Sequence, residues 1–123
     1  GVVGQPGSGI AFKLTPDTDA LSGGPLSIPV GKVACPANMT TYITYWAKLS
    51  AAGPTAQLRV PGGRYPGVGS PGADIVAAIS ATAFTQYTVS FTPTENCVVD
   101  VFADVWGSTT QNLVVSGPVV VSQ

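Results

Sequence analysis

Short segments of alternating apolar and polar residues, bounded by glycine and proline, are the feature that most restricts how this chain can fold. Fifteen glycines and eleven prolines are spread along its 123 residues. The segments between them are rich in valine, isoleucine, threonine and aromatic residues, and their period of two is typical of β-strands. We expect eight strands, at residues 10–15, 26–30, 40–50, 56–60, 74–80, 85–92, 98–106 and 112–121.

Regularly spaced short strands of this kind predict an all-β protein, built as an antiparallel β-sandwich or barrel. A chain of 123 residues can bury one core but not two, so we expect a single domain over residues 1–123. Residues 1–9 precede the first strand and are expected to form an extended N-terminal arm. Pro29 and Pro118 interrupt two of the strands, which predicts that these strands lie at sheet edges or carry bulges.

Several function classes are disfavoured by what the chain lacks. Its five lysines and arginines are scattered singly against six acids, so no basic surface would attract the backbone of a nucleic acid. No apolar run approaches the roughly 18 to 20 residues that span a bilayer. Without histidine, neither a Ser-His-Asp nor a Cys-His active site can be built. We therefore expect no enzyme, no nucleic acid partner and no membrane span.

Asp100 and Asp104 share one face of a predicted strand and raise the question of a catalytic acid pair. Four residues at about 3.3 Å each separate them by roughly 13 Å. Glycosidases place their two carboxyl groups about 5 to 9.5 Å apart. These two acids are therefore too far apart to serve as a glycosidase centre.

Three stretches carry a family resemblance: YITYWAKLSAAGPTAQLRV, FTQYTVSFTPT and VVDVFADVWG, followed by a last valine-rich strand. In this order they resemble the jelly-roll domains of the carbohydrate-binding-module and galactose-binding-like type, which also occur in secreted glycoside hydrolases and phage virion proteins. The resemblance covers most of the chain from residue 10. It implies an antiparallel β-sandwich that is a jelly roll of about eight strands.

The chain departs from this family in one respect, the residues of a calcium site. Many members hold a structural calcium ion with an aspartate of the last strand and an acid near the N-terminus. Here the last strand reads LVVSGPVVV, with Ser116 and Gly117 in place of the carboxylates, and the first acid of the chain is Asp17. Since calcium takes six to eight oxygen ligands including carboxylates, we expect no metal here. We expect no other cofactor either.

The two cysteines test this topology. If residues 40–49 and 85–92 are adjacent antiparallel strands, as in a jelly roll, Cys35 and Cys97 fall at the same end of the sandwich. A disulfide between them is then expected, and closing a loop of this length would stabilise the fold by roughly 4 kcal/mol. The alternative is two independent buried thiols in a reducing compartment. On the predicted loop that follows Cys35, Asn38 begins an Asn-Met-Thr sequon that permits glycosylation.

The alternation also predicts which side chains point outward. On the strand at 40–50 these include Tyr42 and Trp46, and on the strand at 98–106 they are aspartates and aromatics in turn. Jelly-roll topology places the last set beside Gln57 and Arg59 of the strand at 56–60. The long loop at 60–73 is either a linker-like insertion or a binding loop, in which Arg64 and Tyr65 carry recognition chemistry.

Two functions fit such a surface. The first is binding of a glycan or cell-surface polysaccharide, with aromatic rings stacking on the sugar and planar polar groups bonding its hydroxyls. The second is structural, with the same face contacting identical or other subunits of a virion, filament or surface layer; an ordinary surface with cross-strand pairs is a third interpretation. Because the chain starts at Gly1, as a processed protein or part of a longer one would, we expect an extracellular or virion-associated location. The candidate ligand-binding residues are Trp106, Phe102, Trp46, Tyr42, Asp100, Asp104, Arg59, Gln57 and Tyr65.

Overall fold

The computed structural model describes residues 11–15, 26–63, 65, 67–68, 73–107 and 111–122. The regular structure in these residues is entirely β-strand. Each predicted strand is present, and its ends differ from the prediction by at most one residue except at the end of the second. The strands are β1 (Ala11–Leu14), β2 (Leu26–Cys35), β3 (Thr41–Leu49), β4 (Thr55–Val60), β5 (Ile75–Ile79), β6 (Thr85–Phe91), β7 (Cys97–Trp106) and β8 (Leu113–Ser122).

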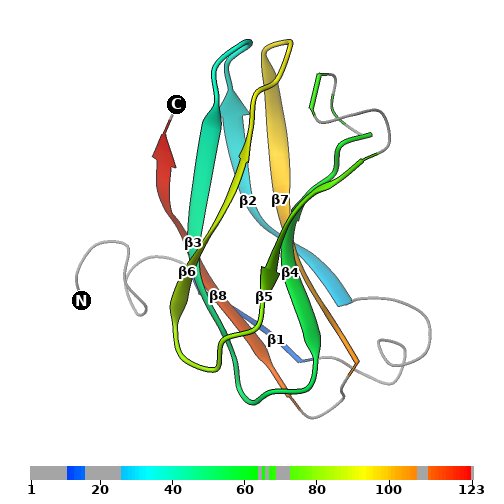
Figure 1. The fold of residues 1–123 in the computed structure, drawn as a ribbon, viewed down its shortest axis with the longest axis vertical. Coiled ribbons are helices and arrows are strands. Elements are labelled where there is room, and N and C mark those ends of the chain that lie inside the picture. The colour runs from blue at the N-terminus through cyan, green and yellow to red at the C-terminus, as the bar shows by residue number, and fades with distance from the viewer. Residues whose placement is uncertain are drawn as a thin grey trace.

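The strands form two four-stranded sheets packed face to face (Figure 1). The first sheet has the order β1-β8-β3-β6 and the second has the order β2-β7-β4-β5, and every neighbouring pair is antiparallel. This alternation of strands between two sheets is the jelly-roll topology, so the predicted fold class is confirmed. The expected pairing of the third and sixth strands is also present, with Thr41 opposite Phe91.

The core lies between the sheets, and the alternation of the sequence places it there. In β3 from Ile43 onward and in β7 from Val99 onward, every second residue points inward and is at most 2 % exposed. Burying a valine, leucine or isoleucine side chain contributes about 1.5 to 3 kcal/mol, so these two strands supply much of the stability. The inward residues are Ile43, Tyr45, Ala47, Leu49, Val99, Val101, Ala103 and Val105.

Both strands with an internal proline are irregular there, as predicted. β2 lies at the edge of its sheet, and its register with β7 shifts between Pro29 and Gly31. This bulge moves the buried positions from Val30 to Val33 and Cys35, which lets the strand continue to Cys35 instead of ending at residue 30. β8 is a central strand, and its register with β3 shifts beside Pro118.

The turns gather at two ends of the sandwich. The turn from β2 to β3 and the turn from β6 to β7 lie side by side at the upper end in Figure 1, where Asn38 N donates a hydrogen bond to Pro93 O at 2.7 Å. The C-terminal end of β7 lies at the opposite end. The predicted N-terminal arm at residues 1–9 lies outside the described residues. No segment of the described part of the chain forms a helix long and apolar enough to cross a membrane.

Candidate functional site

The outward residues of β7 form one patch with their neighbours on β2 and β4. Asp104 lies between β2 and β4 in the register, and so does Phe102, which has Pro29 on one side and Arg59 on the other. Trp106 lies at the end of β7, opposite Thr55. We call this patch the Asp104 face, and its residues are Ser27, Gln57, Arg59, Phe102, Asp104 and Trp106.

Asp104 is fully buried although it belongs to the outer face of the sheet. Its Oδ1 accepts hydrogen bonds from Ser27 Oγ at 2.6 Å and Arg59 Nη2 at 3.2 Å. Its Oδ2 accepts from Gln57 Nε2 and Arg59 Nε, both at 2.8 Å. Burial alone would raise the pKa of Asp104, but these hydrogen bonds and the guanidinium charge outweigh it and lower the pKa below its ordinary value. Asp104 is therefore an ionised group whose oxygens are already used within the protein.

Arg59 is held on three sides. Besides its two bonds to Asp104, it has Nη1 3.9 Å from Asp74 Oδ2, and its Cζ lies 4.8 Å from the centre of the Phe102 ring. The hydrogen bond to Asp104 raises the pKa of Arg59, so the guanidinium stays charged. A guanidinium fixed by a carboxylate and a ring loses little conformational entropy when it binds something further.

The two aromatic residues of this face differ in what covers them. Phe102 has Arg59 over its ring and Pro29 as its partner on the neighbouring strand, so one face of the ring is already in contact with the protein. Trp106 is half-buried and ends the strand, just before Gly107 with a φ of 89°. Trp106 is therefore the better stacking surface for a ligand on this face.

Asp100, nearer the start of β7, is hydrogen-bonded to Tyr65. The Tyr65 hydroxyl donates to Asp100 Oδ2 at 2.5 Å and accepts from Asp100 N at 3.0 Å, and Lys32 Nζ lies 3.9 Å from Asp100 Oδ1. Tyr65 thus fastens the loop between β4 and β5 to the sheet, together with Val68, which is 2 % exposed. Of the predicted recognition pair in this loop, Tyr65 has a structural contact, and Arg64 lies outside the described residues.

Tyr42 and Trp46, which are also among the candidate ligand-binding residues, do not belong to this patch. They lie on β3 in the first sheet, whose outer face points away from the second sheet. We call their surface the Tyr42 face; its residues are Tyr42, Thr44, Trp46 and Lys48. Tyr42 is 47 % exposed, and Lys48 Nζ lies 4.9 Å from the centre of the Phe84 ring.

Sequence reasoning missed three polar contributors to the second sheet's outer surface. Ser27 and Lys32 come from β2, and Asp74 lies just before β5. Ser27 and Lys32 are outward residues on opposite sides of the bulge in β2, so a predicted strand that ends at residue 30 leaves out Lys32 and its relation to β7. A jelly-roll order applied to β2 would have found Ser27.

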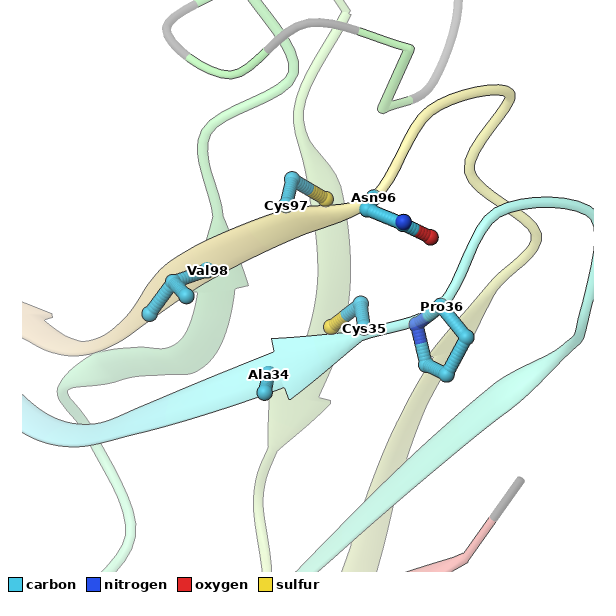
Figure 2. A pocket seen from close by; sticks show the side chains of 6 residues that line it. All are labelled: Ala34, Cys35, Pro36, Asn96, Cys97 and Val98. Carbon is cyan, nitrogen blue, oxygen red and sulfur yellow. The ribbon is translucent and has the colours of Figure 1, made fainter.

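The two cysteines are direct partners in the register, Cys35 at the end of β2 and Cys97 at the start of β7. Both are free thiols in this structure, so the expected disulfide is not formed here. They line an open pocket, the thiol pocket, at the upper end of the molecule (Figure 2). Its lining residues are Ala34, Cys35, Pro36, Asn96, Cys97 and Val98.

Two further predictions concern single positions. Asn38, the sequon asparagine, is exposed in the turn between β2 and β3 and has a φ of 63°. Ser116, which replaces a carboxylate of the family's calcium site, is 1 % exposed on β8 beside Trp46. Within the described residues, no group of three or more cysteine, aspartate or glutamate side chains is placed to hold a metal ion.

Comparisons with known proteins add a partial likeness in fold. No protein family model matches the chain, and no curated protein matches it. A solved structure described as a family 16 carbohydrate-binding module-2 superposes with a TM-score of 0.44 at 12 % sequence identity. The superposition covers 85 % of this chain and 82 % of that one.

Proposed function

We propose that this protein binds a glycan through the Asp104 face, without catalysis. The observation that carries the proposal is the complete burial of Asp104 with hydrogen bonds from Ser27, Gln57 and Arg59. A carboxylate used in this way fixes a planar amide and a planar guanidinium side by side on an open sheet. Planar groups held in position beside an aromatic ring are suited to the hydroxyl-rich edges and C–H faces of sugars.

In this proposal the residues divide into two roles. Trp106 stacks on a sugar ring, while Gln57 and Arg59 bond its hydroxyls through the atoms that Asp104 leaves unused. Asp104 and Phe102 are positioning residues, because Asp104 has no exposed surface and Phe102 is covered by Arg59. The Tyr42 face has an exposed ring, but no buried and hydrogen-bonded carboxylate among its described residues.

A matched pair of variants on the two outer faces tests the proposal. Trp106→Ala removes the stacking ring of the Asp104 face, and Tyr42→Ala removes an exposed ring from the opposite face. The probes are a printed array of defined glycans and columns of insoluble polysaccharide. We expect retention of the wild-type protein and of Tyr42→Ala, and a loss of at least about tenfold in affinity for Trp106→Ala, since stacked aromatics contribute about 1 to 3 kcal/mol each.

Other outcomes contradict the proposal in distinguishable ways. Retention that depends on Tyr42 and not on Trp106 would assign binding to the other sheet. No retention on any probe, together with a high-order assembly in native mass spectrometry that Trp106→Ala dissolves, would make the Asp104 face a subunit contact. Unfolding curves of both variants exclude a trivial loss of structure.

A further inference from the structure

The end of the sandwich opposite Trp106 carries a second chemical feature, the pair of thiols. Cys35 and Cys97 are the last Cα partners in the antiparallel ladder of β2 and β7. Directly opposite residues of such ladders have Cα atoms about 4.5 to 5.5 Å apart. Disulfides form between residues whose Cα atoms are about 4.4 to 6.8 Å apart. The backbone therefore already has the separation that a covalent bond between these side chains needs.

The side chains also point the same way. The inward positions of β2 after its bulge include Val33 and Cys35, and those of β7 include Val99, so Cys35 and Cys97 both lie on the inner side of the sheet. Cys35 is 2 % exposed and its Sγ donates to Val33 O at 3.5 Å, whereas Cys97 is only partly buried. Figure 2 shows both thiols beside the thiol pocket, on neighbouring strands.

The turns that frame the pair are tied together by hydrogen bonds. Ala37 N donates to Asn96 Oδ1 at 2.8 Å, and the hydroxyls of Thr40 and Thr92 are 2.7 Å apart. With the Asn38–Pro93 backbone bond, these contacts hold the two strand ends in register without help from a covalent link. A bond between the thiols would then form with little movement of the backbone.

We propose that Cys35 and Cys97 are a dithiol site that is oxidised to an intramolecular cross-strand disulfide by exchange with a small-molecule disulfide such as oxidised glutathione. The Cys97 thiolate, the more accessible of the two, attacks one sulfur of the reagent and releases the other as a thiolate. The Cys35 thiolate then attacks Cys97 Sγ and releases the second reagent thiolate. Two protein thiols are oxidised, one reagent disulfide is reduced, and the two protons end on the released thiols.

The surroundings of the pair predict how fast this happens. Burial raises the pKa of both thiols, and the nearby carboxylate of Glu95 adds to this at Cys97. The thiolate fraction at neutral pH is therefore small, and oxidation is slow there. Because the thiolate is the attacking species, the rate should rise by about tenfold per pH unit between pH 7 and 8.

The test equilibrates the folded protein in buffers with a range of ratios of reduced to oxidised glutathione. Remaining thiols are then trapped with a maleimide after acid quenching and denaturation. We expect a monomer that is lighter by two hydrogen atoms and carries no label at oxidising ratios, and two labels at reducing ratios. The oxidised form should also unfold at a temperature higher by roughly 10 °C or more, since the bond closes a loop of about 60 residues.

A displaced thiol provides the matched control. Val98 is 53 % exposed and is the register partner of Ala34 on the outer side of the sheet. The double variant Cys97→Ser with Val98→Cys therefore keeps two cysteines at almost the same sequence separation but should form no intramolecular bond. Two labels on the wild-type protein at every glutathione ratio, a disulfide-linked dimer, or equal bond formation in the displaced variant would each overturn the proposal.

Discussion

At Asp104, the charge and the burial of one residue organise a whole surface. Three side chains from two neighbouring strands donate to its two oxygens, and no part of it reaches solvent. Breaking a buried charge pair from one side typically costs more than the pair contributes, because the remaining partner loses its counter-charge. Asp104 should therefore affect stability and binding together.

The pH dependence of stability isolates the charge of Asp104. Its pKa is lowered on folding, so the ionised form stabilises the protein above the unfolded carboxyl pKa of about 4, and this contribution is lost as the pH falls through the folded pKa. We expect Asp104→Asn to lower the free energy of unfolding by about 2 to 3 kcal/mol at pH 7. In urea unfolding, the difference from wild type should narrow well below pH 4.

A neighbouring acid serves as the control for this prediction. The Asp74 side chain is 41 % exposed, and its Oδ2 lies 3.9 Å from Arg59 Nη1. Asp74→Asn should therefore lower the free energy of unfolding by less than about 1 kcal/mol, both at pH 7 and at pH 3. A difference for Asp104→Asn that is the same at pH 7 and pH 3 would contradict the assigned role of its charge.

For Tyr45 in the core we expect a substitution to stabilise the protein and not to destabilise it. Its hydroxyl is buried without a hydrogen-bond partner in the described part of the chain. Burial raises the pKa of this hydroxyl far above its ordinary value, so it stays neutral. Tyr45→Phe removes an unsatisfied polar group and keeps the ring, and we expect the free energy of unfolding to rise by about 1 kcal/mol.

Gly31 supplies a coupled test of the same site. A Cβ at Gly31 would overlap the Tyr45 hydroxyl oxygen, so we expect Gly31→Ala to destabilise the protein by about 2 kcal/mol. In the Tyr45→Phe background most of this loss should disappear. Chemical denaturation of the two single variants and the double variant measures the coupling, and strictly additive effects would show that the contact is not the cause.

Among the larger elements, the loop between β4 and β5 depends on one tyrosine. The Tyr65 hydroxyl both donates to and accepts from Asp100 of β7. Tyr65→Phe keeps the packing and removes both bonds, so the loop should open more often. We expect tryptic cleavage after Arg64 to become several-fold faster, as followed by mass spectrometry, with no change in the far-ultraviolet circular dichroism spectrum. An unchanged cleavage rate would contradict the anchoring role.

Strand faces were predictable from the sequence wherever a strand is regular, and less so at a bulge or in a loop. Alternation alone placed Asp104, Phe102 and Trp106 on one side of β7, because side chains of a strand point to opposite faces in turn. It failed at β2, where one extra residue beside Gly31 reverses the pattern. Tyr65 could not be assigned to Asp100, since a loop's path follows no period.

Across the whole molecule, the jelly-roll order decides which distant residues meet. It brings Ser27, Gln57 and Asp104 together across three strands and places Tyr42 and Trp46 on the opposite surface. The family resemblance anticipated this division, because it paired the strand at 40–49 with 85–92 and the strand at 98–106 with 56–60, and both pairings are present. The extracellular or virion-associated location stays a prediction.

One strand, β7, begins at Cys97 and ends at Trp106. Nine residue steps at about 3.3 Å each separate these positions by roughly 30 Å. A Cys35→Ser variant would leave Cys97 as a single chemical handle for coupling the protein to a sensor chip or a fluorophore. Molecules immobilised in this way would all have the same orientation. The Asp104 face would stand perpendicular to the support, with Trp106 at the end farthest from it.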